Sequence, residues 1–139
     1  MHSLWNDQEA AQYEGEIGLR VYTSRLLGRE PALVLHGGGN TSVKTLRTTI
    51  TGIEEDILYI KGSGADLVTI TAQGFAPVRM QALLDLARLP TLSDSAMMNE
   101  LKVQTVVTGA PTPSVETILH ALLPYKFVDH SHADAIIAV

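Results

Sequence analysis

The chain has 139 residues, of which 45% are hydrophobic and 18% charged, so it is long and apolar enough for one domain with a hydrophobic core. Its formal net charge of −5 excludes a basic surface for nucleic acid, and its lack of cysteine excludes disulfides and thiolate metal sites. No signal-peptide or membrane-length apolar run occurs, so we expect an untargeted, cytoplasmic protein with no membrane partner.

The first half of the chain predicts one helix followed by short strands. Apolar residues recur at helical spacing over 7–27, and Gly28 stands where a C-cap is expected. Runs of apolar and β-branched residues between glycine-rich turns predict strands at 33–35, 43–44, 48–51, 57–60, 67–71 and 75–78. The acidic turn at 52–56 lies between two of these strands, which favours a hairpin and a mostly antiparallel sheet.

The second half predicts three helices and a last strand. Residues 80–89 and 93–107 have helical spacing, are separated by Pro90, and leave Ser93 or Asp94 as a candidate N-cap. Thr-Pro-Ser at 112–114 predicts the start of a helix that runs to 123, and apolar residues at 127–128 predict a strand. We expect these helices to pack on one face of the sheet.

The sharpest local pattern is the histidine pair His130 and His132. Alternate residues on an extended segment point to the same side, so the two imidazoles can bind one metal ion. Neutral imidazole suits zinc and neighbouring metals. By itself the pair is equally well explained as two exposed histidines beside the acids Asp129 and Asp134, so the metal site is one of two open interpretations.

Glu116 and His120 lie four residues apart, on one face of the predicted helix. A carboxylate near a helix N-terminus is favoured by the macrodipole, so Glu116 has a purely structural interpretation as well as a catalytic one. His120 could orient that carboxylate or be an ordinary, partly buried histidine.

Two glycine-rich loops could bring backbone N–H groups close to an anion. They are the loop at 37–40, which ends in Asn40, and the Lys-Gly-Ser-Gly sequence at 61–64. Neither has the spacing of a P-loop or of the dinucleotide fingerprint, and each alone is explained as a turn. Together with Ser114 and the histidine pair, they favour a site for a phosphorylated substrate and a metal.

In chain order, four motifs resemble the signature set of the class II aldolase/adducin family. They are Gly-Asn-Thr-Ser at 39–42, Lys-Gly-Ser-Gly at 61–64, Pro-Ser-Val-Glu at 113–116 and His-Ser-His at 130–132. The resemblance runs from about residue 10 to the end. Within the family, the chain is most similar to the aldolase half of bifunctional rhamnulose-1-phosphate aldolase/alcohol dehydrogenases.

The resemblance implies an α/β fold of three layers, α/β/α, around a central and mainly antiparallel sheet, of which residues 1–139 would be the N-terminal portion. It implies a homo-oligomer, in the family a tetramer, that acts on a small-molecule sugar phosphate. The substrate phosphate would be bound by residues of both loops and of the 113–116 motif: Asn40, Ser63, Gly64 and Ser114. His130 and His132 would bind Zn²⁺ or another divalent metal, and Glu116 would be the acid/base residue, with a pKa raised by burial.

The implied reaction is aldol cleavage of a ketose 1-phosphate, for example rhamnulose 1-phosphate, to dihydroxyacetone phosphate and an aldehyde. An epimerase or dehydratase of the same family and a non-catalytic adducin-like interaction module are the alternatives. Two departures from the family pattern matter. Val115 stands where family aldolases often have a second serine, and the third histidine ligand would lie beyond Val139. We therefore expect the 139-residue chain to be inactive alone.

Overall fold

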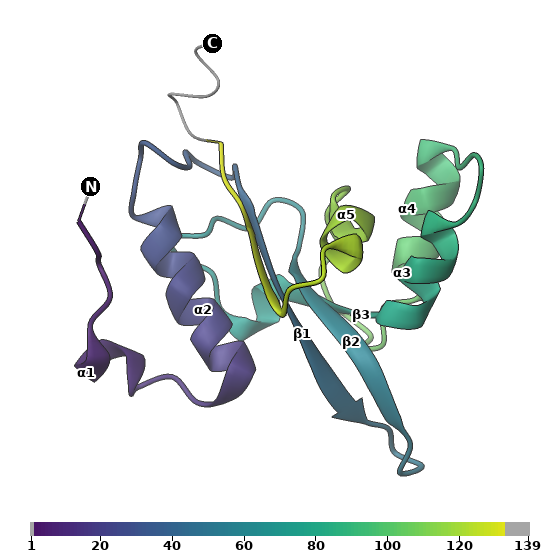
Figure 1. Ribbon diagram of the computed structural model, residues 1–139, viewed down its shortest axis with the longest axis horizontal. Helices are drawn as coiled ribbons and strands as arrows, with labels where there is room; N and C mark the ends of the chain where they lie inside the picture. The colour runs from purple at the N-terminus through teal and green to yellow at the C-terminus, as the bar shows by residue number, and fades with distance from the viewer. Residues whose placement is uncertain (1, 133–139) are drawn as a thin grey trace.

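The computed structural model describes residues 2–132, and an antiparallel four-stranded sheet forms its centre. The strands are β1 (Asn40–Thr48), β2 (Glu54–Lys61), β3 (Phe75–Arg79) and β4 (Phe127–His130), in the order β3-β2-β1-β4. The hairpin of β1 and β2 projects beyond the rest of the molecule (Figure 1). The predicted hairpin and the mainly antiparallel sheet are thus confirmed.

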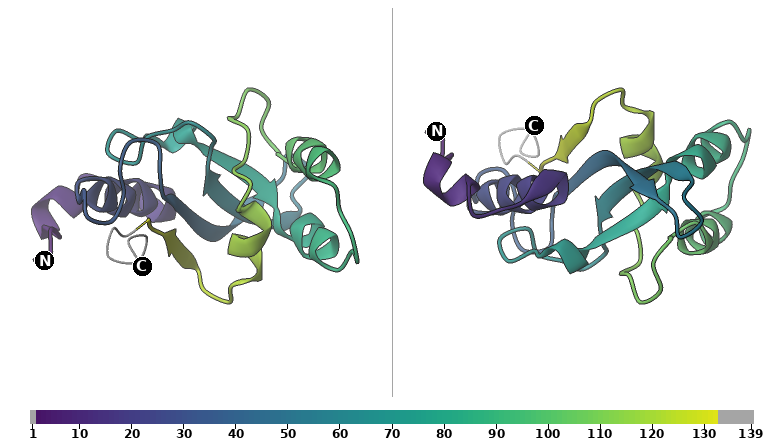
Figure 2. Two further views of the ribbon diagram at one scale, coloured as in Figure 1. Left: turned by 90° about the horizontal axis from the view of Figure 1, so that it is seen from above. Right: turned by 90° about the horizontal axis from the view of Figure 1, so that it is seen from below.

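Helices cover both faces of this sheet (Figures 1 and 2). The long helix α2 (Gly15–Gly28) packs on one face, preceded by the single turn α1 (Asp7–Ala10). The other face carries α3 (Met80–Ala87), α4 (Asp94–Val103) and α5 (Thr117–Leu122). A short 3-10 turn, η1 (Ala72–Gly74), leads into β3. The three-layer α/β/α arrangement is as predicted.

The alternation of side chains along β2 explains why both faces are covered. Leu58 and Ile60 are fully buried on the side of α3, α4 and α5, where they pack with Leu83 and Leu101. Tyr59 points the other way and packs in the second core, which is built around α2. A strand with two apolar faces needs helices on both sides, so β2 sets the layered architecture.

Two predicted strands are wrong. Residues 33–35 and 67–71 are turns and irregular segments, in which Leu33 N–H donates to the Glu30 carbonyl at 3.0 Å and Thr69 N–H to the Asp66 carbonyl at 3.2 Å. Their apolar residues Val34 and Leu67 are nevertheless buried in the core around α2. These apolar runs are therefore explained by burial in the core around α2 and not by pairing in the sheet.

Several predicted boundaries also move, and the helix predicted at 93–107 ends at Val103. The predicted helix 7–27 is interrupted at 11–14, before Gly15, whose φ of 69° favours glycine. β1 ends at Thr48, so the predicted strand 48–51 is mostly the hairpin turn. The last helix begins at Thr117 instead of near 112, because residues 112–113 run beside the loop at 62–63, where Ser63 N–H donates to the Thr112 carbonyl at 2.9 Å.

Candidate functional site

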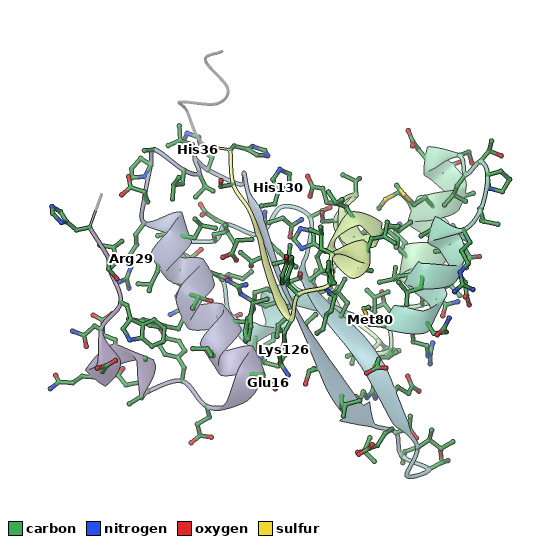
Figure 3. All side chains as sticks on the ribbon, in the orientation of Figure 1. Glu16, Arg29, His36, Met80, Lys126 and His130 are labelled. Carbon is green, nitrogen blue, oxygen red and sulfur yellow. The ribbon has the colours of Figure 1, made fainter. Side chains whose placement is uncertain are left out.

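Three loops that are far apart in the sequence meet at the end of the sheet opposite the hairpin tip. They enclose a cavity of about 200 Å³, which is lined by Gly37–Gly39, Asn40, Lys61–Gly64, Ser114–Glu116 and His132. Every residue predicted to bind phosphate (Asn40, Ser63, Gly64 and Ser114) lines it. His36 and His130 lie at this same end of the molecule (Figure 3). The predicted convergence of the loops on one pocket is confirmed.

The carboxylate of Glu116 lies at the centre of a compact hydrogen-bond cluster. The Asn40 amide donates to Glu116 Oε2 at 2.7 Å, and the Ser114 hydroxyl donates to the same oxygen at 2.6 Å. Asn40 also donates to the Ser114 hydroxyl, which accepts in addition from the Glu116 N–H at 3.1 Å. Asn40 and Ser114 are both buried, so β1 and the segment before α5 are joined through Glu116.

These contacts set the protonation of Glu116. Burial raises the pKa of its carboxyl, but the hydrogen bonds from Ser114 and Asn40, together with the nearby His130, lower it more, so the pKa lies below its usual value. The expectation that burial would leave a raised pKa is therefore wrong. Two short hydrogen bonds to the ionised form outweigh partial desolvation, and Glu116 is a carboxylate at neutral pH.

The histidine pair lies directly beside this carboxylate. His130 is paired with Asn40 in the sheet, and the backbone N–H of His132 donates to the Leu33 carbonyl at 2.7 Å. The two imidazole ring centroids are 5.0 Å apart, and His130 Nδ1 lies 3.6 Å from Glu116 Oε1. The rings therefore lie on the same side of the backbone, as the alternation predicts.

A metal ion fits the donors that this arrangement presents. Glu116, His130 and His132 each offer one ligand atom, and these atoms lie within 4.8 Å of one another. The Nδ1 atom of His130 is buried and makes no hydrogen bond to the described residues. Two imidazole nitrogens and a carboxylate oxygen are ligands that zinc and related divalent metals accept.

Lys61 is a residue of this pocket that the sequence did not single out for a role. Its ammonium group donates to the Gly37 carbonyl at 2.8 Å and to the Gly39 carbonyl at 3.0 Å, so it connects the two glycine-rich loops. Burial lowers the pKa of Lys61, although the nearby carboxylates of Glu116 and Asp66 oppose this change. The sequence did contain a signal for Lys61: a charged residue at the end of a buried strand, directly before the glycine-rich loop that begins with Gly62.

His120 does not hold the Glu116 side chain in the way that one interpretation predicted. Its Nδ1 atom lies 2.7 Å from the Ser42 hydroxyl instead. The side chain is almost completely buried, and burial together with the nearby His130 lowers its pKa to about 4. His120 is therefore neutral at physiological pH, and it links α5 to β1.

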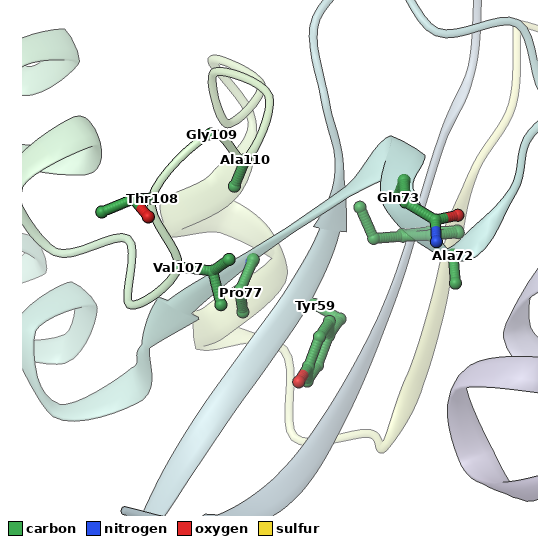
Figure 4. A pocket seen from close by; sticks show the side chains of 9 residues that line it. Tyr59, Ala72, Gln73, Pro77, Val107, Thr108, Gly109 and Ala110 are labelled. Atoms are coloured by element: carbon green, nitrogen blue, oxygen red, sulfur yellow. The ribbon is translucent and has the colours of Figure 1, made fainter.

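A second cavity, of about 330 Å³, lies over the part of the sheet next to the loop at 107–110 (Figure 4). It is lined mainly by apolar groups, including Tyr59, Phe75 and Pro77. No predicted site residue lines this cavity. Separately, none of the described helices is long and apolar enough to cross a membrane.

Comparison with known proteins agrees with this geometry. Residues 19–139 match the family described as Class II Aldolase and Adducin N-terminal domain. The chain resembles the solved structure of the N-terminal Class II Aldolase domain of a conserved protein from Thermoplasma acidophilum, with a TM-score of 0.90 and 46% identity. That match covers 99% of this chain and 63% of the other.

The chain is also 38% identical over 136 residues to the uncharacterized oxidoreductase YuxG of Bacillus subtilis (strain 168), a match that covers 98% of this chain and 20% of that protein. It thus spans less than two thirds of either similar protein. The family match extends over most of the chain, and the solved domain shares its fold at high identity. The chain belongs to the class II aldolase and adducin N-terminal domain family.

Proposed function

We propose that this domain carries the active site of a metal-dependent aldehyde-lyase, an aldolase that cleaves a ketose 1-phosphate. The observation that carries the proposal is the meeting of Glu116, His130 and His132, with ligand atoms within 4.8 Å, beside a cavity lined by two glycine-rich loops. A scaffold domain has no physical need for this combination of ionisable groups at one pocket.

His130 and His132 are the proposed metal ligands, and Zn²⁺ is the expected ion. β4 holds His130 through its pairing with Asn40, and the hydrogen bond of the His132 N–H to the Leu33 carbonyl fixes His132, two residues after the end of the strand. A divalent ion bound there would supply Lewis acidity toward the oxygen atoms of the substrate.

Glu116 is the proposed acid/base residue. The hydrogen bonds from Asn40 and Ser114 fix one carboxylate oxygen, Oε2, and leave Oε1 on the side of His130. A carboxylate that is ionised and held in one orientation can accept a proton from a substrate carbon and return it. The family resemblance implies an aspartate at this position in the related epimerases, so the glutamate supports an aldolase over an epimerase. A dehydratase of the family also has glutamate there and stays an alternative.

The cavity beside Glu116 is the proposed site for the substrate phosphate. Ser63 and Gly64 are exposed at its rim, and Gly64 has a φ of 82°, which turns the loop sharply at this point. The Lys61 ammonium adds a fixed positive charge to the wall. Because Asn40 and Ser114 are bound to Glu116 here, a phosphate ligand would have to share or displace these hydrogen bonds.

Rhamnulose 1-phosphate is the substrate that we propose to test first, because the sequence motifs resemble those of aldolases of that kind. The oxidoreductase named among the similar proteins is much longer, since this chain covers 20% of it. An oxidoreductase activity of a longer protein and an aldolase activity of this domain are therefore compatible. We propose the lyase reaction for this domain only.

The first test is a titration with Zn²⁺, followed by calorimetry, and with Co²⁺, followed by visible absorption. The chain should bind one ion weakly, because two imidazoles hold zinc less tightly than a closed three-ligand site. Replacement of either ligand, in His130→Ala or His132→Ala, should weaken binding further, by more than the 10- to 100-fold loss typical of residues that contact a ligand but not the metal. The control is His36→Asn, which changes an exposed histidine of the neighbouring loop whose φ is 52°, a conformation that asparagine tolerates. Equal metal affinity in all variants would contradict the metal site.

The second test is an aldol-cleavage assay on rhamnulose 1-phosphate and other ketose 1-phosphates, with the 139-residue chain and the full product of its gene in parallel. We expect dihydroxyacetone phosphate as a product, low turnover by the chain alone, and a loss of at least about 10²-fold in Glu116→Gln. Formation of an isomeric sugar phosphate in place of two fragments would favour an epimerase, and absence of any reaction by the full product would favour a non-catalytic domain.

A further inference from the structure

Arg20 is a charged residue that lies inside the domain. It belongs to α2, and only 1% of its surface is exposed. A guanidinium group keeps its proton under all ordinary conditions, so burying it costs free energy unless specific partners surround it. The partners of Arg20 therefore indicate what the protein gains from placing a charge there.

Within the described residues, the polar partners of the Arg20 guanidinium lie in the two strands that support the candidate site, and its Nε makes no hydrogen bond there. One nitrogen lies 2.7 Å from the Asp129 carboxylate in β4, and another donates to the Ser42 carbonyl in β1 at 3.2 Å. The ring of Phe127, also in β4, has its centroid 5.6 Å from the guanidinium carbon. Arg20 thus bridges β1 and β4 from the side of α2.

This bridge lies next to the rung of the sheet that carries the candidate site. Ser42 is opposite Val128, and two residues away along β1 Asn40 is opposite His130. β4 has four residues, and in the described part of the chain it pairs with β1 alone. Backbone hydrogen bonds to one neighbour leave such a short edge strand free to tilt, and the planar fork of Arg20 removes that freedom.

Ser42 also connects the bridge to Glu116. Its carbonyl accepts from Arg20, while its hydroxyl pairs with His120 Nδ1 at 2.7 Å. His120 lies one helical turn after Glu116, and its N–H donates to the Glu116 carbonyl at 3.1 Å. Ser42 is therefore connected both to β4, through Arg20, and to α5, through His120.

We propose that Arg20 is a positioning residue, which orients β4 so that His130 and His132 face Glu116. This inference rests on the proposed metal site, but it concerns the placement of side chains that exist with or without the ion. A merely structural Arg20 would affect only the free energy of unfolding. A positioning Arg20 would also affect metal affinity and the environment of the two imidazoles in the metal-free protein.

The test compares Arg20→Met with two controls. Arg25→Met removes another arginine of α2, one that donates to the Ile70 carbonyl at 2.8 Å, far from β4 in the sequence. Glu16→Gln removes the exposed ion pair between Glu16 and Lys126, a residue directly before β4. Each variant is studied by thermal unfolding, by Co²⁺ titration with visible spectra, and by imidazole NMR of the metal-free protein at one fixed pH.

We expect Arg20→Met to weaken Co²⁺ binding by about 10- to 100-fold, to change the visible spectrum of bound Co²⁺, and to shift the imidazole signals of His130 and His132 more than that of His36. Arg20→Lys should recover only part of the affinity. Its ammonium group keeps the positive charge but cannot reach both Asp129 and Ser42 as the guanidinium does. Arg25→Met should lower the unfolding temperature but keep wild-type affinity, and Glu16→Gln should change neither greatly.

Wild-type metal affinity and unchanged imidazole signals in folded Arg20→Met would overturn the proposal. If Arg20→Met does not fold, Asp129→Ala decides the question, because the Asp129 side chain is 55% exposed and its removal leaves no buried cavity. It should weaken Co²⁺ binding in the same direction, and wild-type affinity would overturn the proposal. If the wild-type protein binds no Co²⁺, the proposed function fails, and the imidazole signals of the metal-free variants still decide the role of Arg20.

Discussion

At the scale of single residues, His120 shows how a buried polar group makes stability depend on pH. Burial and the nearby His130 and Lys44 lower its pKa, Glu116 and Asp129 oppose them, and the result is a pKa of about 4. In the unfolded chain the pKa of histidine is about 6.5. The unfolded state therefore takes up a proton between these two values, while the folded state does not.

We predict that the free energy of unfolding is constant above about pH 6.5 with respect to His120 and falls as the pH is lowered toward 4. The difference in pKa corresponds to a loss of about 2–3 kcal/mol by pH 4. The measurement is urea unfolding at several pH values for the wild type and for His120→Gln. The variant should lose less stability over this range, and identical slopes for both proteins would contradict the prediction.

Glu116 illustrates what the sequence does not reveal at this scale. The residue type and its place before a helix identify a candidate acid/base group. The direction of its pKa shift depends on Asn40, which lies far away in the sequence and donates to the same carboxylate oxygen as Ser114. These groups meet only because the fold places the segment before α5 beside the start of β1.

At the scale of elements, the close packing of α2 depends on its last residue. Gly28 was predicted as a C-cap, but it is the last residue of α2, and the C-cap is Arg29. A Cβ atom on Gly28 would lie 2.4 Å from the backbone nitrogen of Val68 and 2.7 Å from the carbonyl carbon of Leu67. The glycine is therefore needed because the backbone of another segment touches the helix end.

We predict that Gly28→Ala lowers the free energy of unfolding by about 1–3 kcal/mol, the range typical of overpacking. The control is Gly37→Ala, where a Cβ atom would meet nothing within 4 Å. That change should stay within about 0.5 kcal/mol in stability. Chemical denaturation of both variants gives the comparison, and equal effects would show that α2 can move away from residues 67–68 at little cost.

The elements also show where sequence patterns succeed and where they fail. Alternation of side chains and turn residues predict the β1–β2 hairpin and β3, because strands that pair in these parts of the sheet are close in sequence. The apolar runs at 33–35 and 67–71 look the same as strands, but they form turns that cover the core around α2. Periodicity reports which residues are buried, and it cannot report whether a sheet or a loop buries them.

At the scale of the whole molecule, many exposed apolar side chains occur in the segment between Val115 and Phe127. We define the α5–β4 apolar surface by its six exposed large side chains: Val115, Leu119, Leu122, Leu123, Tyr125 and Phe127. Leu119 and Leu122 lie three residues apart on one side of α5, and Phe127 begins the edge strand β4. Grouped apolar residues of this kind are typical of protein interfaces.

We predict that the chain self-associates through the α5–β4 apolar surface, in agreement with the expected homo-oligomer. Light scattering coupled to gel filtration, over a range of concentrations, should show a mass above that of one chain. The double variant Leu119→Glu/Leu122→Glu should be a monomer, because each carboxylate would be desolvated in the interface. Val103→Glu, which changes an exposed apolar residue of α4, is the control. A monomeric wild type would contradict the prediction.

The strand order β3-β2-β1-β4 has a consequence for how the protein is made. β1 is the first strand to leave the ribosome and β4 is the last of those described, yet the two are neighbours. One edge of β1 therefore stays open until the chain has been synthesised past His130, and long-range pairing of this kind is slow. Asn40 and His130 meet in that final pairing. A ligand that binds the candidate site would therefore stabilise the pairing of β4 with β1 by mass action.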